Sequence, residues 1–337
     1  MRVGIAGASG YAGAELLRLC AGHPDLEVVV AGGDSQAGQP VATLYPSLAA
    51  AYPGLEFSKV GVDDLVDLDV VFLALPHGES QELAPAVANR VRVLVDLSAD
   101  FRLRDVGAYP RWYGHDHSAP ELLDEFAYGL PELFRAPLVG ARLVAAPGCY
   151  PTAAALALTP LVRAGVVEPT GVIVDAASGV SGAGRKLAHS THFNTADEDF
   201  TAYGLLTHRH TPEIEQATGA QVLFTPHLAP MNRGILATCY ARPASDLHTD
   251  DVLGILRDAY EGERFVVVSE ASPSTKATLG SNCAHVTGRV DPRTGWVLVL
   301  CALDNLVKGA SGQAVQCANI ALGFPEATGL PIVGVYP

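Results

Sequence analysis

The sequence predicts an α/β protein in which a Rossmann-type nucleotide-binding domain is joined to a second α+β domain that carries a mixed sheet. Three observations predict this fold class. The chain opens with an apolar strand, a glycine-rich turn and a helix. Strand-like and helical runs then alternate through the first half, as in a parallel sheet. In the second half, strand-like runs are separated by loops, which is typical of a mixed or antiparallel sheet.

The opening segment has the layout of a dinucleotide site. Residues 2–6 are apolar and predict a strand, and a helical pattern follows the turn up to Gly22. The turn reads GxxGxxG, a variant of GxGxxG, whose glycines let the backbone approach a pyrophosphate at a helix N-terminus. The alternative is a plain structural turn. We predict that the cofactor contacts come from Gly7, Ser9, Gly10, Tyr11, Ala12 and Gly13.

The residues after the second strand, which is predicted over 26–31, bear on the choice between NAD and NADP. An acidic residue at this point favours NAD, whereas a small or basic loop leaves room for the 2′-phosphate of NADP. Ser35 can donate a hydrogen bond to such a phosphate, but Asp34 repels it if it faces the site. The two residues therefore give a mixed indication.

Polar residues follow two later strands, predicted over 69–75 and 91–97. Ligands of open parallel sheets bind beyond the carboxyl ends of the strands. We therefore expect Ser98 and Arg102 to hold a substrate anion. The alternative for Arg102 is a surface ion pair with a neighbouring aspartate.

One cysteine differs from the other five in its surroundings. A strand is predicted over 143–146, and a helix is predicted to start near Pro151 and to run towards Arg163, because proline favours the first helical position. Cys149 then lies just ahead of the helix, where the helix dipole stabilises a thiolate, and Gly148 leaves space for a substrate. We predict Cys149 as a nucleophile. The alternative, a small buried thiol, fits Cys20, Cys239, Cys301 and Cys317.

The motif HRHTPEIE offers the proton-transfer partner that a thiolate needs. Thr211 is predicted to cap a helix, so that His210 lies just before its first turn. A histidine there can act as acid or base near neutral pH, and Glu213 can orient it. Glu213 has a simpler alternative role, because acids in a first turn complement the helix dipole. His208 is assigned to substrate binding, although the residues alone do not decide between the two histidines.

A third cluster, SGVSGAGRK at residues 178–186, follows a predicted strand at 172–176. Its glycines, hydroxyls and bases are typical of an anion-binding loop, and Arg185 is the candidate for binding substrate. The alternative is a flexible basic loop.

The remaining strands and the last helix suggest two domains. Strands are predicted over 171–177, 221–226, 233–241, 264–269, 283–290 and 296–303. A helix beginning near residue 312 is expected to return to the nucleotide-binding domain. We therefore predict one domain from residues 1–148 plus about 312–337, and a second from residues 149–311, for catalysis, substrate binding and oligomerisation.

Composition excludes several classes of function. A net charge of −14 argues against a nucleic-acid partner, because phosphates would be repelled. We expect no membrane partner, since no apolar run approaches the roughly 20 residues of a membrane helix. The chain opens on a strand and shows no targeting segment, so a cytoplasmic protein is expected. The cysteine and histidine spacings indicate no metal site.

Taken together, the motifs resemble those of the N-acetyl-gamma-glutamyl-phosphate reductase family, within the aspartate-semialdehyde dehydrogenase superfamily. The resemblance covers nearly the whole chain and rests on eight motifs in order. These are GIAGASGYAGAEL, FLALPHG, DLSADFRL, YGLPEL, PGCYPTAA, SGVSGAGR, HRHTPEIEQ and DNLVKGASGQAVQ. One such motif is weak, but eight in order are very specific.

The resemblance implies a division of labour. Cys149 matches the family nucleophile, and His210 matches the general acid/base with Glu213 beside it. The glycine-rich turn and Ser35 match the NADP site. Asp34 departs from the family, which more often has a small or basic residue there. Positions around the cofactor and active site are matched by Ser178, Gly182 and Asn319.

The implied activity is the NADPH-dependent reduction of an N-acetylglutamyl phosphate, a small-molecule acyl phosphate, through a cysteine thioester in a homo-oligomer. A related alternative is a reductase of carrier-linked aminoadipyl or glutamyl phosphate in lysine biosynthesis. The carrier would be acidic, and this acidic chain offers no basic partner surface for it. A non-enzymatic alternative is an NADP-binding regulator, but such relatives usually lose the nucleophile or the base.

Overall fold

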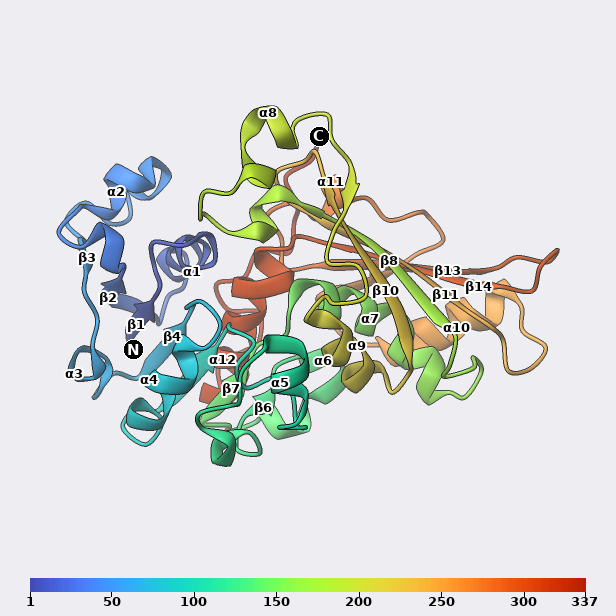
Figure 1. The fold of residues 1–337 in the computed structure, drawn as a ribbon, viewed down its shortest axis with the longest axis horizontal. Helices are drawn as coiled ribbons and strands as arrows, with labels where there is room; N and C mark the ends of the chain where they lie inside the picture. The colour runs from blue at the N-terminus through green and yellow to red at the C-terminus, as the bar shows by residue number, and fades with distance from the viewer. The chain divides into compact units, whose positions relative to one another are not determined.

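The computed structural model describes residues 1–337 and divides into two compact units (Figure 1). Unit 1 comprises Met1–Pro147 and Ala310–Leu330, and unit 2 comprises Gly148–Gly309 and Pro331–Pro337. The final residues thus group with unit 2, whereas the sequence placed them with the nucleotide-binding part. The reason is local pairing, since Asn282 donates its backbone N–H to Pro331 and Val335 donates to Leu279.

Unit 1 contains a seven-stranded sheet in which every pairing is parallel. The strand order is β3-β2-β1-β4-β5-β7-β6, so the sheet grows away from β1 in both directions. Ligands of such sheets bind at the point where the strand order reverses. The strands are β1 (Arg2–Ala6), β2 (Glu27–Gly32), β3 (Phe57–Ser58), β4 (Val70–Leu73), β5 (Val93–Asp96), β6 (Ala127–Tyr128) and β7 (Leu143–Ala145).

Helices complete unit 1, and the last of them comes from the end of the chain. They are α1 (Tyr11–Ala21), α2 (Val41–Leu44), α3 (Val62–Leu65), α4 (Glu79–Val87), α5 (Ala108–Tyr113), α6 (Pro131–Phe134) and α12 (Gly312–Leu322). Helix α12 packs against β5 and α1 and is buried along nearly its whole length. Helix α12 therefore belongs to unit 1, although unit 2 precedes it in the chain.

Unit 2 contains a mixed seven-stranded sheet in the order β12-β13-β14-β11-β8-β10-β9. The pairs β8–β10 and β12–β13 are parallel, and the others are antiparallel. The two sheets together confirm the predicted fold class. The strands are β8 (Val172–Gly179), β9 (Thr201–Ala202), β10 (Val222–Ala229), β11 (Ile235–Ala241), β12 (Val266–Val268), β13 (Ala284–Val290) and β14 (Val297–Leu303).

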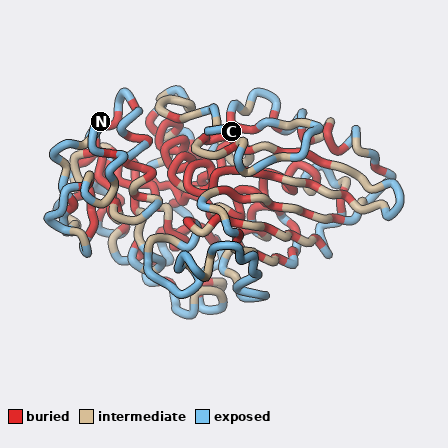
Figure 2. Tube along the Cα trace, turned by 90° about the horizontal axis from the view of Figure 1, so that it is seen from above, coloured by how far each residue is buried: buried red, intermediate tan, exposed pale blue.

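The core of unit 2 lies between this sheet and three long helices. The helices of the unit are α7 (Cys149–Arg163), α8 (Phe193–Ala196), α9 (His210–Thr218), α10 (Thr249–Ala259) and α11 (Thr275–Thr278). Helix α7 packs on β11 and β14, α9 on β10 and α10 on β13. Buried and half-buried residues alternate along β8 and β11, so one row of side chains faces the core and the other does not. Figure 2 shows how buried, intermediate and exposed residues are distributed along the whole chain.

The starts of two helices differ from the prediction. Helix α7 begins at Cys149, two residues before Pro151, because the carbonyl of Gly148 accepts the N–H of Thr152. Helix α9 begins at His210, so Thr211 is not its cap. Both predicted catalytic residues therefore lie in a first helical turn.

Candidate active site

The glycine-rich turn between β1 and α1 is shaped to bring a ligand close to the backbone. Gly7 has a φ of +86°, and a side chain there would collide with the carbonyl of Ala74, the residue that follows the neighbouring strand β4. A side chain at Gly13 would collide with the backbone of Gly7. The N-cap Gly10 supplies no side chain to the first N–H groups of α1, so these groups remain available for an anion. The turn therefore fits a dinucleotide pyrophosphate.

The segment after β2 lies beside this turn. A Cβ added at Gly33 would come within 2.9 Å of the Cβ of Ser9, so the segment contacts the glycine-rich turn directly. Asp34 and Ser35 follow in a single turn of 3₁₀ helix, and both are exposed. The amide of Gln36 donates a hydrogen bond to the carbonyl of Ser35 at 2.9 Å. Asp34 and Ser35 are therefore both open to solvent beside the glycine-rich turn.

Ser98 is not presented to a ligand as predicted. Its side chain is buried, and its Oγ donates to Asp96 at 2.8 Å and accepts the backbone N–H of Asp100 at 3.1 Å. Burial, followed by the nearby charge of Asp100, raises the pKa of Asp96 to about 6. Asp100 in turn accepts the N–H groups of Gly78 and Gln81 at the start of α4. These residues hold the end of β5 together, and the sequence could not distinguish this buried role from anion binding.

Arg102 is also placed differently from both of its interpretations. It is buried and therefore forms no surface ion pair. Its Nε donates to the carbonyl of Ala146 at 2.7 Å, and its Nη2 donates to the carbonyl of Leu97 at 2.7 Å. The guanidinium thus joins the segments that follow β5 and β7. Ala146 lies three residues before Cys149 in the chain.

Asn319 is not placed as a cofactor ligand. It is fully buried in α12, and its Oδ1 lies 3.0 Å from Nε2 of His23. Its Nδ2 donates to the carbonyls of Glu326 and Thr328, at 3.0 and 2.9 Å. The amide therefore ties α12 to the end of α1 and to the loop that follows α12, which is a structural role within unit 1.

Cys149 is the first residue of α7 and the only cysteine that is not buried. The 15-residue helix directs the positive end of its dipole towards the thiol, which favours a thiolate. Gly309 packs against it so closely that an added Cβ would lie 2.8 Å from the Cβ of Cys149. The thiol is thus partly open on one side and confined by backbone on another.

A carboxylate fixes the residue before the nucleophile. Oε1 of Glu213, a residue with no exposed surface, accepts the backbone N–H of Gly148 at 2.8 Å. Glu213 lies in the first turn of α9, three residues after His210. This bond holds the starts of α7 and α9, which carry Cys149 and His210, next to each other. The sequence predicted a carboxylate that orients His210, but not its bond to the nucleophile loop.

Aromatic rings surround the two histidines. The ring of His208 meets those of Tyr150, Tyr203 and Phe224 edge-on, at centroid distances of 5.8, 5.4 and 5.3 Å. His210 lies 4.9 Å from His208 and 5.9 Å from Tyr150. Burial, with a smaller effect of Arg209, lowers the pKa of His208 to about 4, so His208 is neutral at physiological pH.

The loop after β8 contains both buried and accessible groups. Ser178 is buried, with its Oγ bonded to the carbonyl of Gly179. A Cβ at Gly182 would approach that Oγ to 2.7 Å, so the loop folds back on the end of β8. Asn305 stabilises the same loop through a 3.0 Å bond from its Nδ2 to Ser181. Arg185 is partly exposed.

Comparison with known proteins identifies the family. Residues 2–141 match the family model described as semialdehyde dehydrogenase, NAD binding domain, and residues 149–305 match semialdehyde dehydrogenase, dimerisation domain. Proteins named N-acetyl-gamma-glutamyl-phosphate reductase are 52% identical in Symbiobacterium thermophilum and 49% identical in Desulforudis audaxviator. The alignments cover the whole chain and 99% and 100% of these relatives. The chain belongs to the N-acetyl-gamma-glutamyl-phosphate reductase family.

Solved structures of aspartate semialdehyde dehydrogenases share the fold of this chain. Aspartate semialdehyde dehydrogenase II from Vibrio cholerae is 16% identical, with a TM-score of 0.70 over 96% of this chain and 98% of that one. The Candida albicans enzyme, solved with NADP, is 14% identical, with a TM-score of 0.69 over 95% and 98% of the two chains. At these identities the likeness concerns the fold alone.

Some residues that shape the candidate site were not predicted from the sequence. Gly309 confines Cys149, and Asp304 accepts the N–H groups of Leu306 and Val307 at the start of the same turn. Residues Val307–Ser311 form a π-helical turn, which is often found at functional sites. The motif DNLVKGASGQ contained the signal, but only its helix was interpreted.

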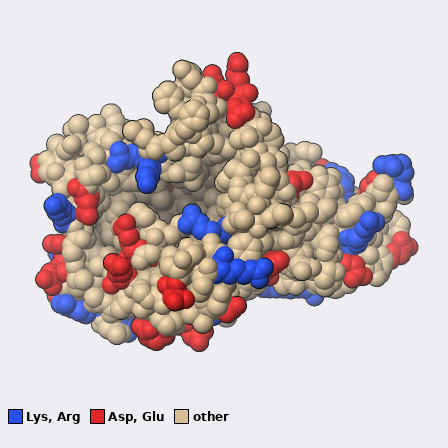
Figure 3. All heavy atoms as spheres, in the orientation of Figure 1, with Lys and Arg blue, Asp and Glu red and all other residues tan.

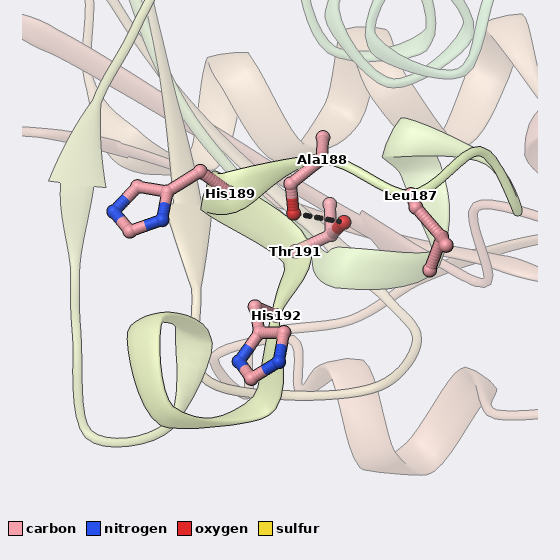
Figure 4. Close-up of a pocket in the computed structure, with 5 residues that line it drawn as sticks. All are labelled: Leu187, Ala188, His189, Thr191 and His192. Atoms are coloured by element: carbon pink, nitrogen blue, oxygen red, sulfur yellow. Dashed lines mark hydrogen bonds between the residues drawn. The ribbon is translucent and has the colours of Figure 1, made fainter.

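Other surface features lie outside this site. A hollow of about 330 Å³ is lined by Leu187, Ala188, His189, Thr191 and His192, none of which was predicted as a site residue (Figure 4). Acidic and basic side chains are intermingled on the face drawn in Figure 3. None of the helices has the length and apolar character needed to cross a bilayer.

Proposed function

We propose that this chain catalyses the NADPH-dependent reduction of N-acetyl-L-glutamyl 5-phosphate to N-acetyl-L-glutamate 5-semialdehyde with release of phosphate, a step of arginine biosynthesis. The observation that carries the proposal is the position of Cys149. It is the only cysteine that is not buried, it opens a long helix, and it shares a site with His210 through the Glu213–Gly148 bond. The names of relatives 44–52% identical over the full chain support this substrate.

In the first step the thiolate of Cys149 attacks the acyl carbon of the acyl phosphate. A carbon–sulfur bond forms, the carbon–oxygen bond to phosphate breaks, and inorganic phosphate leaves with the bonding electron pair. The product is a thioester on Cys149. The step divides one difficult substitution into two easier ones. The dipole of α7 stabilises the thiolate, and the Gly148 N–H held by Glu213 fixes its position.

In the second step NADPH, when bound, supplies the hydride that reduces the thioester carbonyl. His210 donates a proton to the developing oxyanion, which gives a thiohemiacetal. The same histidine then removes the hydroxyl proton as the carbon–sulfur bond breaks, which yields the aldehyde and regenerates the thiolate. One residue can serve as both acid and base because an imidazole titrates near neutral pH.

The cofactor is proposed to bind along the glycine-rich turn. Its pyrophosphate would lie against Gly10 and accept hydrogen bonds from the backbone N–H groups of Tyr11 and Ala12, where α1 begins. The 2′-phosphate of NADP would meet Ser35, beside the exposed Asp34. On unit 2, Ser178 and Gly182 are proposed to shape the loop beside the active site. Arg185, from the same loop, is the proposed partner for the phosphate or carboxylate of the substrate.

We also propose that the protein is a cytoplasmic homo-oligomer. The match of residues 149–305 to a dimerisation domain supports self-association. Between β8 and α9 the chain carries several exposed apolar side chains that a second copy would cover. The most exposed are Leu187, Phe193 and Leu206, at 96%, 73% and 73%. Sedimentation of the purified protein tests this part of the proposal, and a monomer at micromolar concentration contradicts it.

The reverse reaction tests the activity. N-acetylglutamate semialdehyde, inorganic phosphate and NADP are mixed with the protein, and reduced cofactor is followed by absorbance. Reduction that requires phosphate is the expected result, because phosphate must release the acyl group from Cys149. A protein that binds NADP but shows no phosphate-dependent reduction contradicts the proposal.

Cys149→Ser provides the mechanistic test, because a serine hydroxyl is not ionised by the helix dipole. Acylation by the acyl phosphate should fall by at least 10³-fold, the order of loss typical for a covalent nucleophile. Cys20→Ala, at a buried cysteine of α1, is the matched control and should keep activity. Normal acylation of Cys149→Ser rules out the thioester scheme.

A further inference from the structure

His208 occupies an unusual position at the start of α9. Its Nδ1 accepts the backbone N–H of His210 at 3.1 Å, and its backbone carbonyl accepts the N–H of Thr211 at 3.0 Å. One residue therefore satisfies two of the N–H groups that a helix leaves unpaired at its N-terminus. The residue in the cap position, Arg209, makes no side-chain hydrogen bond to the helix. His208 thus does the work of a cap from one residue further back.

The first of these bonds determines the tautomer of His208. A backbone N–H can only donate, so Nδ1 must be the unprotonated nitrogen and Nε2 must carry the hydrogen. Protonation of Nδ1 would break the bond. The rings of Tyr150, Tyr203 and Phe224 meet the imidazole edge-on and leave it only partly exposed.

We infer that His208 is a positioning residue for His210: its neutral imidazole, accepting the backbone N–H of His210, fixes the first residue of α9 and with it the proton-transferring ring. The inference rests on the role proposed above for His210. A ring displaced by one ångström is enough to slow a positioned proton transfer strongly. The titratable and charged groups that face His208 are Arg209 and His210 on its own segment, Tyr203 before it, and Tyr150 from α7.

The neutral state also matters for the chemistry of the neighbouring ring. The centroids of His208 and His210 lie only 4.9 Å apart. A positive charge on His208 would disfavour the protonated form of His210, which the oxyanion requires as its proton donor. The lowered pKa of His208, caused by burial, leaves its imidazole uncharged near neutral pH.

Two substitutions separate positioning from packing. His208→Asn keeps an acceptor at the position of Nδ1 but loses the ring, whereas His208→Phe keeps a ring of similar shape but loses the acceptor. We expect His208→Phe to lower kcat by at least tenfold with KM changed by less than twofold, because positioning acts on the transition state. His208→Asn should restore kcat to within about threefold of the wild type.

The opposite order, an active His208→Phe and an impaired His208→Asn, overturns the inference, because the ring would then matter only as packing. Equal loss in both variants also overturns it. Failure of the proposed function is distinguishable, since the wild type itself would then show no phosphate-dependent reduction. Circular dichroism checks that both variants fold.

A measurement on the wild type does not depend on the variants folding. The ¹⁵N shifts of the His208 ring, recorded from pH 5 to 8, should show one neutral form with hydrogen on Nε2 throughout. A ring that titrates near pH 6.5, or that carries its hydrogen on Nδ1, is incompatible with the bond to His210.

Discussion

Glu213 holds the backbone N–H of Gly148 from 65 residues further along the chain, at 2.8 Å and out of contact with solvent. The bond joins the first turns of two helices, one carrying the proposed nucleophile and the other the proposed acid/base. The carboxylate of Glu213, which the sequence predicts to orient His210, thus also fixes the backbone of the residue before Cys149.

Glu213→Ala should therefore impair catalysis more than folding. Hydrogen bonds to charged groups contribute about 1.5–3 kcal/mol, so kcat/KM should fall by roughly 10- to 100-fold. Glu213→Gln keeps an acceptor oxygen and should lose less. Glu215→Ala is the matched control on the same helix. The carboxylate of Glu215 accepts the backbone N–H of Val222, so its loss should affect stability only. Steady-state kinetics that rank Glu215→Ala below Glu213→Ala in activity would refute this role.

Gly309→Ala should displace the nucleophile. The new Cβ would lie 2.8 Å from the Cβ of Cys149 and 3.2 Å from its Cα, so the start of α7 must move. We expect a loss of activity of at least tenfold and a changed rate of alkylation of Cys149 by iodoacetamide. Gly254→Ala, in the middle of α10 with no atom near the added Cβ, is the control and should be neutral or slightly stabilising. An unchanged alkylation rate in Gly309→Ala would show that the turn at Gly309 moves aside and leaves Cys149 in place, which contradicts the prediction.

Asn319→Leu should destabilise unit 1 without weakening cofactor binding. The substitution removes three side-chain hydrogen bonds and leaves two backbone carbonyls and His23 without their partner. Loss of a buried polar group of this kind costs about 2–4 kcal/mol. Urea unfolding measures the loss, and NADP titration of the folded variant should give an unchanged Kd. A large increase in Kd with normal stability would restore the cofactor role predicted from the sequence.

The buried carboxyl of Asp96 should produce a measurable pH dependence. Its pKa of about 6 in the folded protein lies above the ordinary value of 3.8, so the folded state binds more protons than the unfolded state between these values. Stability from this group is therefore present at low pH and lost as pH rises through 6, by an amount on the order of 3 kcal/mol.

Asp96→Asn removes this dependence while keeping an acceptor for the N–H of Ser98. Compared with the wild type, the variant should gain relative stability between pH 4.5 and 7. Urea unfolding at three pH values gives the difference directly. A difference that is constant with pH would mean that Asp96 does not titrate in this range.

Cofactor choice is the least determined of the sequence predictions. Ser35→Ala should raise KM for NADP several-fold and leave KM for NAD unchanged, because only NADP carries the 2′-phosphate. Asp34→Ala, at the neighbouring exposed residue, should lower KM for NADP if its charge opposes that phosphate. Equal responses for the two cofactors would place the 2′-phosphate elsewhere.

Local patterns in the sequence were enough to predict much of this fold. The strand–turn–helix at residues 2–22 could be predicted from the spacing of its glycines and from its apolar runs. Both patterns involve residues that are close together in the sequence. Two-residue strands such as β3 and β9 show no period, so they could not be predicted. The start of α7 at Cys149 was also missed by two residues, because proline marks an early helical position but not the first one here.

The candidate site was predicted only in part, for a different physical reason. Cys149 and His210 carry their chemistry in their own side chains and helix positions. Ser98, Arg102 and Asn319 are equally polar, but their partners are backbone carbonyls or carboxylates that only the folded chain brings near. Conversely, Gly309 has no chemistry of its own and acts through its closeness to Cys149. Such contacts depend on long-range packing, which residue type does not encode.

The path of the chain has a consequence for how the protein is made. Helix α12 completes unit 1 by packing on β5 and α1, yet it follows the long segment Gly148–Gly309 of unit 2 in the chain. A ribosome therefore releases the first 147 residues long before the element that closes their fold exists, and unit 2 is made in between. The first unit must remain partly open until α12 has been synthesised. Nascent chains stalled before residue 310 should accordingly remain sensitive to protease in their earliest part, and to chaperones that bind exposed apolar surface.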